Sequence, residues 1–209
     1  MFLNIIAADA DRPILMKNQF PTNFLNWADI ENIVNNYMYF TPVELINESN
    51  QKVFAPLINL PWVNNGRDPE FVMNSIAKGN TFIITKLNRY NSSLNHLCHQ
   101  IENMIKGNCD VHAYCGLTDN AVSFHRHSDN AYNLIIQQDG TCHWKVWMPD
   151  QEKPYIDTVL EPGDAIYIPK SYSHECIPTG KRMSLSLRFE PGKRLYRNWL
   201  KLNSSNENN

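Results

Sequence analysis

The chain has 209 residues with a formal net charge of −2, and 43% of its residues are hydrophobic. This length corresponds to one domain, which can bury a sizeable core. The chain has no surplus of basic residues with which to neutralise phosphates, so nucleic acid is not expected as a partner. It also has no run of 18 apolar residues, which argues against a transmembrane helix and a membrane partner.

The N-terminal residues and the cysteines indicate in which cellular compartment the protein is expected. The start, MFLNIIAADADRP, contains two aspartates and no basic segment before its apolar residues, which is not typical of a signal peptide. The five cysteines show neither paired spacing nor a CxxC motif. An odd number of unpaired cysteines argues against a disulfide framework and favours a reducing compartment. We therefore expect a cytoplasmic protein.

Helices are predicted in the first half of the chain, at 27–37, 68–78 and 93–106. The first segment carries apolar residues on one stripe. The second begins with Asp68 at an N-cap position, has proline as its first helical residue, and is followed by Gly79. The third has apolar residues at i, i+3, i+4, i+7 and i+11 and is followed by Gly107.

Beyond residue 110 the sequence consists of short apolar or alternating runs, which predict strands. Turn signals at 138–141, 161–164 and 178–181 separate these runs. Helices followed by seven or eight strands indicate an α+β chain that ends in an antiparallel sandwich or a small barrel.

Two histidines and one aspartate in this region predict a metal site. His127 and Asp129 are two residues apart, so on a strand they share one face. His174 follows a turn, an apolar strand and a proline-broken loop, as the late ligand of a cupin-type barrel does. Two histidines and one carboxylate suit Fe(II) and leave open positions for oxygen chemistry. The alternatives are surface polar residues at the first pair and a strand-capping histidine at the third position.

A second histidine pair leaves the ligand set open. His125 and His127 also share one strand face, and cupins use such a pair together with a glutamate and a late histidine. No glutamate follows at the required distance, and Asp129 comes too early. We therefore favour His127 and Asp129, with His125 beside the site or at its mouth.

Several motifs together resemble the JmjC-type 2-oxoglutarate oxygenases, especially their ribosomal oxygenase branch. HSDNAYNLIIQQDG begins at His127 and is followed by Trp144, and PGDAIYIPKSYSH ends at His174. The segment 76–116 resembles the lead-in of that family, and 182–191 resembles its final strand. The resemblance covers about 25–190.

The resemblance implies a fold, a ligand set and a cosubstrate. The fold would be a double-stranded β-helix (a jelly-roll or cupin-like barrel) with N-terminal helices packed on it. It would form one domain over 1–202, with its β-helix core at 110–190, an N-terminal α/β region at 1–109 and a disordered tail at 203–209. His127, Asp129 and His174 would bind Fe(II). Asn133 and Tyr114 would lie against 2-oxoglutarate.

One position departs from the family pattern. Fifteen residues after the first metal-binding histidine the family has lysine or arginine, which pairs with the distal carboxylate of 2-oxoglutarate, whereas this chain has Cys142. A thiol cannot neutralise a carboxylate. Arg188 is the first candidate to replace the cation, because it alternates with apolar residues on its strand. The other candidates, in order, are Lys145, Arg182 and Lys170.

The leading functional hypothesis is an Fe(II)- and 2-oxoglutarate-dependent dioxygenase, a hydroxylase. The resemblance implies a protein or peptide substrate, such as a ribosomal protein. The alternative is a cupin-type metalloenzyme, an isomerase or direct dioxygenase, that does not use 2-oxoglutarate and binds its metal through His125. A third hypothesis is a binding module without catalysis. The oligomeric state stays open.

Overall fold

The computed structural model describes residues 11–37, 43–47, 49, 51–60, 63–118, 121 and 123–192. The expectations for the first ten residues and for the tail at 203–209 lie outside these ranges. The early elements are β1 (Ile14–Met16), α2 (Trp27–Tyr37), β2 (Val43–Ile46), β3 (Lys52–Phe54), β4 (Leu57–Leu60), β5 (Val63–Arg67), α3 (Pro69–Ala77), β6 (Thr81–Ile84), the 3-10 turn η1 (Leu87–Arg89) and α4 (Ser92–Ile105). The later ones are β7 (Asn108–Gly116), β8 (His127–Ser128), β9 (Tyr132–Asp139), β10 (Cys142–Trp147), β11 (Ile156–Leu160), β12 (Ala165–Ile168), β13 (Ser173–Pro178) and β14 (Arg182–Glu190).

The three predicted helices are present, and Asp68 caps α3 as expected, whereas the cap of α4 at Asn91 was not predicted. The Asp68 side chain accepts hydrogen bonds from the first backbone N–H groups of α3, and Asn91 caps α4 in the same way. The apolar stripe of α4 is buried through Leu94, Cys98 and Ile101. No helix within the described residues is long and apolar enough to cross a membrane.

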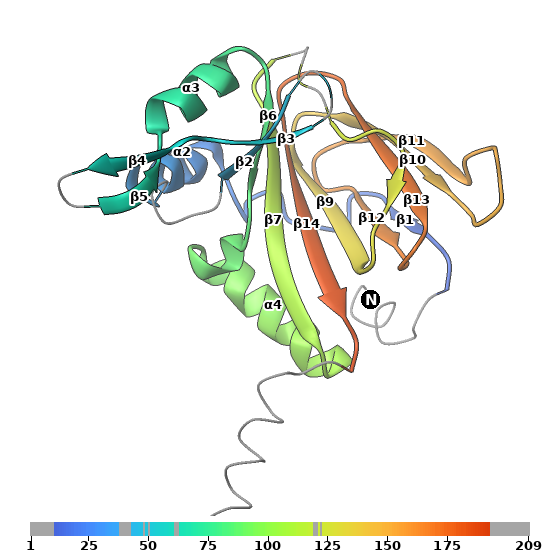
Figure 1. Cartoon of the computed structure of the whole chain (residues 1–209). Helices are drawn as coiled ribbons and strands as arrows, with labels where there is room; N and C mark the ends of the chain where they lie inside the picture. The colour runs from blue at the N-terminus through green and yellow to red at the C-terminus, as the bar shows by residue number, and fades with distance from the viewer. Residues whose placement is uncertain are drawn as a thin grey trace, which may run out of the picture.

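Two sheets carry the later strands. The larger has the order β1-β12-β9-β14-β7-β6-β2-β3, and the smaller has the order β11-β10-β13-β8. At the centre of the larger sheet, β14 pairs antiparallel with both β7 and β9. In Figure 1 the helices lie to the left of β7 and β14, and the strands of the small sheet lie to their right.

The first half of the chain contributes more strands than the predicted order of helices followed by strands allows. The strands β1, β2, β3 and β6 extend the large sheet on both sides. Each has only three or four residues. Such short runs give no clear alternation in sequence, and their pairing with the later strands is what makes them strands.

Alternation along the central strands separates two cores. On β14 the apolar side chains at 183, 185, 187 and 189 belong to the larger core, which α4 also joins. On β9 the neighbours Ile135 and Ile136 belong to different cores, the smaller and the larger respectively. The smaller core contains residues of both sheets, so it lies between them. The opposite face of β14 carries Arg182, Ser184, Ser186 and Arg188, which gives the space between the sheets a polar wall.

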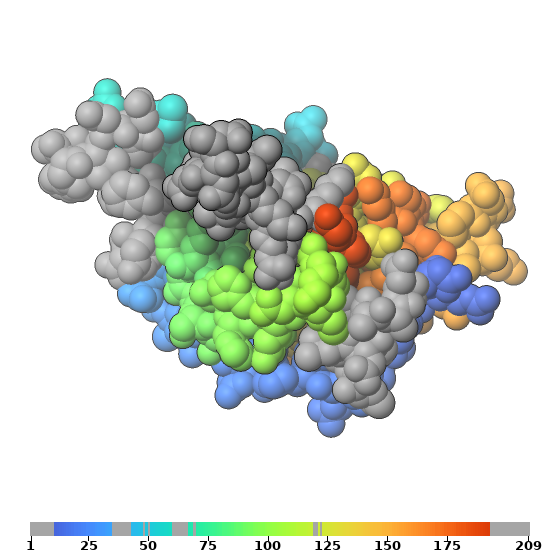
Figure 2. Space-filling model, turned by 90° about the horizontal axis from the view of Figure 1, so that it is seen from below, coloured from blue at the N-terminus to red at the C-terminus, as the bar shows by residue number. Residues whose placement is uncertain are grey.

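Gly107 is required where α4 turns into β7. A Cβ atom at this position would lie 2.0 Å from the backbone oxygen of Glu190. Figure 2 shows α4, in green, against the last described residues of the chain, in red. A side chain at residue 107 would therefore push the helix away from the end of β14.

We expect Gly107→Ala to lower the free energy of unfolding by about 1–3 kcal/mol, because the backbone must shift to admit the methyl group. Urea denaturation measures the change. The matched control is Ser93→Ala on the exposed face of α4, which should stay within about 0.5 kcal/mol. Equal stabilities for both variants would contradict the close approach.

Candidate metal centre

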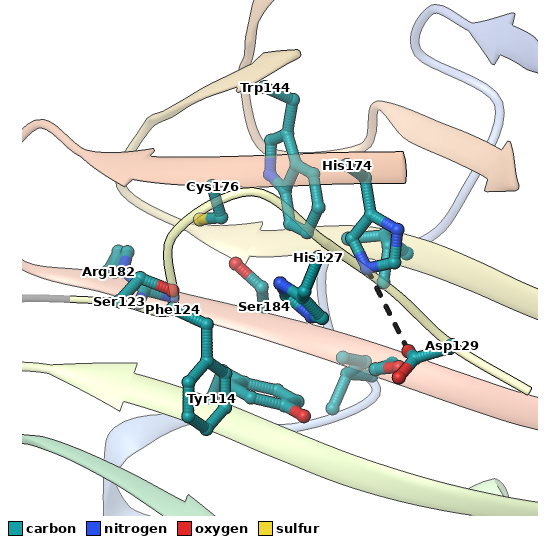
Figure 3. A pocket seen from close by; sticks show the side chains of 13 residues that line it. Tyr114, Ser123, Phe124, His127, Asp129, Trp144, His174, Cys176, Arg182 and Ser184 are labelled. Carbon is teal, nitrogen blue, oxygen red and sulfur yellow. Dashed lines mark ion pairs between the residues drawn. The ribbon is translucent and has the colours of Figure 1, made fainter. Parts of the chain in front are cut away.

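Two elements of the small sheet bring the three predicted ligands together. His127 on β8 is paired directly with His174 on β13, and Asp129 follows β8. One possible ligand atom from each residue lies within 4.8 Å of the others. His174 Nε2 is 3.8 Å from Asp129 Oδ2, the contact drawn as a dashed line in Figure 3.

Backbone carbonyls orient both histidine rings. His127 Nδ1 lies 2.7 Å from the carbonyl oxygen of His125, and His174 Nδ1 lies 3.1 Å from that of Tyr172. A carbonyl oxygen only accepts, so Nδ1 carries the hydrogen in both rings. The Nε2 lone pair of each ring is then left for a metal, which is the usual arrangement of metal-binding histidines.

A buried amide orients the carboxylate. Asn133 Nδ2 donates to Asp129 Oδ2 at 2.9 Å, and the hydroxyl of Ser186 donates to Asn133 Oδ1 at 3.4 Å. Asn133 is 1% exposed. The amide expected to contact 2-oxoglutarate therefore contacts a candidate metal ligand, and its contribution to cosubstrate binding stays a prediction.

The pocket around the three ligands is lined from both sheets (Figure 3). The indole of Trp144 stacks on His174 with ring centres 6.2 Å apart, and Phe124 meets His127 edge-on at 5.5 Å. Tyr114 lines the pocket, and its predicted contact with 2-oxoglutarate stays a prediction. Burial raises the pKa of Tyr114 to about 12, so its phenol stays protonated at neutral pH and can donate a hydrogen bond to an anion. The full lining is Tyr114, Ser123, Phe124, His127, Asp129, Ile135, Trp144, His174, Cys176, Arg182, Ser184, Leu185 and Ser186.

The alternative ligand His125 lies outside the cluster. Its side chain is exposed, and the group of possible metal ligands within the described ranges contains His127, Asp129 and His174. What His125 supplies is the backbone carbonyl that orients His127. The ligand set with a histidine pair from one strand is therefore not the one that the structure brings together.

Of the four cation candidates, Arg182 is the one that lines this pocket, and it is 1% exposed. Arg188, the first choice from sequence, instead lines a separate hollow with Asp110 and Glu190. Both arginines alternate with apolar residues on β14, so alternation alone could not distinguish them. They differ in their position along the strand: Arg188 is paired with Asn133, whereas Arg182 is paired with Gly116 at the other end of β14.

The two lysines also lie away from the metal ligands. Lys145 follows Trp144 on β10 and therefore faces the opposite side of the strand. Its cross-strand partners are Asp157 and Glu175. Lys170 forms an ion pair with Glu190 at 3.8 Å.

Position 142, where the family pattern has a cation, holds a buried thiol beside a second one. Cys142 Sγ is 3.4 Å from Cys176 Sγ, and Cys176 lines the pocket. The hydrogen bond with Cys142 lowers the pKa of Cys176 to about 7, and the charge of Arg182 acts in the same direction. The charge of Arg182 thus acts on both thiols at the place where the family pattern has its cation.

The two sheets bring together three residues that could hold a metal ion, and a comparison with protein families shows to which family the chain belongs. The model of the JmjC domain matches residues 85–195. This match covers more than half of the chain and includes all three candidate ligands. The chain belongs to the JmjC domain family.

Among curated proteins, the chain is similar to the bifunctional lysine-specific demethylase and histidyl-hydroxylase NO66 of two flies. It is 24% identical to the Drosophila erecta protein over 185 residues, which cover 75% of this chain and 28% of that protein. It is 26% identical to the Drosophila willistoni protein over 138 residues, covering 57% of this chain and 18% of that protein. The chain thus spans less than a third of the length of these relatives.

Among solved structures, the chain is similar to the ribosomal oxygenase YcfD of Escherichia coli. The structure in complex with cobalt and 2-oxoglutarate matches with a TM-score of 0.63 at 17% identity, covering 94% of this chain and 54% of that one. A second structure of YcfD matches with a TM-score of 0.62 at 17% identity, covering 87% and 49%. At these identities the likeness shows the shared fold.

We expect Asn133→Ala to weaken metal binding about 10- to 100-fold, because the amide orients the Asp129 carboxylate. Calorimetric titration with Mn(II), an inert substitute for Fe(II), measures the affinity. Ser186→Ala removes only the 3.4 Å bond to the same amide and is the matched control, with a smaller effect. An unchanged Mn(II) affinity in Asn133→Ala would show that the amide does not position the carboxylate.

The pH dependence of stability should report His174. Burial, with the nearby charge of His127, lowers the pKa of His174 below its usual value of 6.5. The unfolded chain therefore binds a proton at a pH where the folded chain does not. The free energy of unfolding that depends on neutral His174 is therefore fully present above about pH 6.5. It decreases as the pH falls toward the pKa of His174 in the folded state.

In the metal-free protein, His174→Gln should flatten the decline of the free energy of unfolding between about pH 7 and pH 5. Urea denaturation across this range measures the slope. His96→Gln, on the exposed face of α4, serves as control and should keep the wild-type slope. A wild-type slope in His174→Gln would contradict the assignment.

Proposed function

We propose that the protein is an Fe(II)- and 2-oxoglutarate-dependent oxygenase, a hydroxylase. The observation that carries the proposal is the convergence of His127, Asp129 and His174 on one point inside a pocket. Membership of the JmjC domain family supports it. Further support comes from the ribosomal oxygenase of similar fold, whose solved structure contains cobalt and 2-oxoglutarate.

The donor set fits Fe(II). Two imidazole nitrogens and one carboxylate oxygen are the ligands of non-haem iron oxygenases, and they leave coordination positions open. Both rings have Nδ1 engaged by backbone carbonyls, so the neutral Nε2 atoms face the site. When bound, the iron would supply the redox chemistry that couples oxidation of 2-oxoglutarate by O2 to oxidation of the substrate.

Residues of the chain would bind the cosubstrate, orient the Asp129 carboxylate and shield the metal from water. Asn133 would hold the Asp129 carboxylate in place through its amide. The phenol of Tyr114 would donate a hydrogen bond to a carboxylate of the cosubstrate. Trp144 and Phe124, which pack on the two histidine rings, would exclude water from the metal.

The proposal includes a fold, a substrate class and a location. The two sheets would form the double-stranded β-helix of one domain over 1–202. The substrate would be a protein side chain, such as one of a ribosomal protein, because the names of the relatives are those of a histidyl-hydroxylase and a ribosomal oxygenase. Five cysteines, all free, support a reducing, cytoplasmic location.

Substitution of the ligands tests the proposal. We expect His127→Ala and Asp129→Ala to abolish both Mn(II) binding in calorimetry and Fe(II)-dependent conversion of 2-oxoglutarate to succinate, because removal of one ligand leaves too few donors to hold the ion. The fold should survive in both variants, as circular dichroism can verify.

The matched control is His125→Ala, which removes an exposed side chain but keeps the carbonyl that orients His127. It should retain Mn(II) binding and turnover. Loss of Mn(II) binding in His125→Ala would indicate that His125 is a metal ligand, as in the cupin alternative. Wild-type Mn(II) binding without any 2-oxoglutarate binding would overturn the proposed cosubstrate.

A further inference from the structure

Arg182 is a buried cation for which the described part of the chain provides no carboxylate partner. Its side chain is 1% exposed. Its guanidinium donates a long hydrogen bond from Nη2 to Thr81 Oγ1 at 3.5 Å, and among the described residues its Nε has no partner. The titratable groups that act most strongly on it are three thiols and the phenol of Tyr114, and none of these is a carboxylate.

This state is costly for a guanidinium. An arginine does not lose its proton in a protein, so burial cannot neutralise it. A charge removed from water needs an opposite charge and hydrogen-bond acceptors close by, or it destabilises the fold. Among the described residues, Nε of Arg182 has no hydrogen-bond partner and Nη2 makes a bond of 3.5 Å to Thr81, which points to an acceptor that is not part of the chain.

A second unpaired group in the same pocket is also a donor. The indole Nε1 of Trp144 is buried without a hydrogen-bond partner among the described residues, and Trp144 lines the pocket together with Arg182. The pocket therefore has hydrogen-bond donors without acceptors at two positions. Its occupant must bring acceptor oxygens, and opposite Arg182 it must bring a negative charge.

The position of Arg182 relative to the candidate metal ligands further limits which molecules could occupy the pocket. Figure 3 shows Arg182 on one side of the pocket and Asp129 on the other, with His127 between them. A molecule that reaches from the metal ligands to Arg182 would place an anionic group at each end. A dicarboxylate has this form.

We propose that Arg182 binds the distal carboxylate of 2-oxoglutarate, in place of the cation that the family pattern has at position 142. This inference rests on the proposed function and assigns the cosubstrate's anchor within the same site. Cys142 and Arg182 belong to different sheets, and Cys176 lies against Cys142 while lining the pocket with Arg182. Because the side chain of Cys142 on β10 is short, the longer side chain of Arg182 on β14 can occupy this end of the pocket.

One group of the chain competes for the same role. Cys176, as a thiolate, would neutralise Arg182 from within the protein. A thiolate is a single, weakly accepting atom, whereas a carboxylate matches the guanidinium through two parallel hydrogen bonds. Whether the Cys176 thiolate or a bound carboxylate neutralises Arg182 can be tested by comparing ligands with and without the distal carboxylate.

Binding of two ligands to the Mn(II)-loaded protein tests the inference. The ligands are 2-oxoglutarate and 2-oxopentanoate, which has a methyl group in place of the distal carboxylate. We expect the wild type to prefer 2-oxoglutarate by about 10- to 100-fold, the range for a hydrogen-bonded charge pair. In Arg182→Gln the two affinities should converge to within about threefold, while the affinity for Mn(II) stays that of the wild type.

The matched variant is Arg188→Gln, which removes the other arginine of β14. It should keep the wild-type preference. A preference that survives in Arg182→Gln and disappears in Arg188→Gln would overturn the assignment and leave the proposed function intact. Failure of the wild type to bind 2-oxoglutarate in the presence of bound Mn(II) would overturn both.

Two further variants separate anchoring from a structural role. Cys176→Ser removes the competing thiolate and should leave the ligand preference unchanged; loss of the preference would indicate that the thiol, and not the guanidinium alone, forms the site. The double variant Cys142→Arg with Arg182→Met returns the cation to β10 and should restore at least part of the preference. If Arg182→Met alone lowers the thermal midpoint and the double variant does not recover binding, Arg182 is a structural residue.

Discussion

The antiparallel pairing of β14 with β7 and β9 is the constraint on which the rest of the molecule depends. Side chains alternate across these strands, so one face packs beneath the helices and the other faces the small sheet. A shift of the register by one residue would turn Arg182 and Ser184 into the apolar core and Leu185 out of it. Burial of the apolar face therefore fixes the register, and the register fixes where every polar group of the pocket lies.

The polar wall is stable because most of its groups are paired with one another. Ser184 donates to Gln137 at 2.7 Å, Ser186 donates to Asn133, and Asn133 donates to Asp129. This sequence of bonds ends at a metal ligand, so the strand that anchors the core also orients the carboxylate. Against this paired background, the exceptions among the described residues of the wall and the pocket are the buried donors without partners on Arg182, Arg188 and Trp144. Unpaired buried donors at a pocket wall are the expected mark of a ligand site.

Position 142 is where this chain departs from the family pattern. Two small buried thiols, those of Cys142 and Cys176, lie there in contact. In the proposed assignment the charge comes from β14 instead, where Arg182 lines the same pocket. Binding of a carboxylate requires a buried cation at a given point, and it does not require that cation to come from a given strand.

The helices and the candidate metal ligands could be predicted from the sequence alone, because both are local patterns. Asp68 marks a helix start through its own side chain, and the spacing of His127 and Asp129 places both on one strand face. The short strands such as β1 needed their partners, since three residues carry no periodicity. The choice between Arg182 and Arg188 was also beyond the sequence, because both satisfy the same alternation. The tertiary structure places Arg182 in the pocket of the candidate ligands and Arg188 in a separate hollow, because the lining of a pocket depends on which residues of other strands lie opposite.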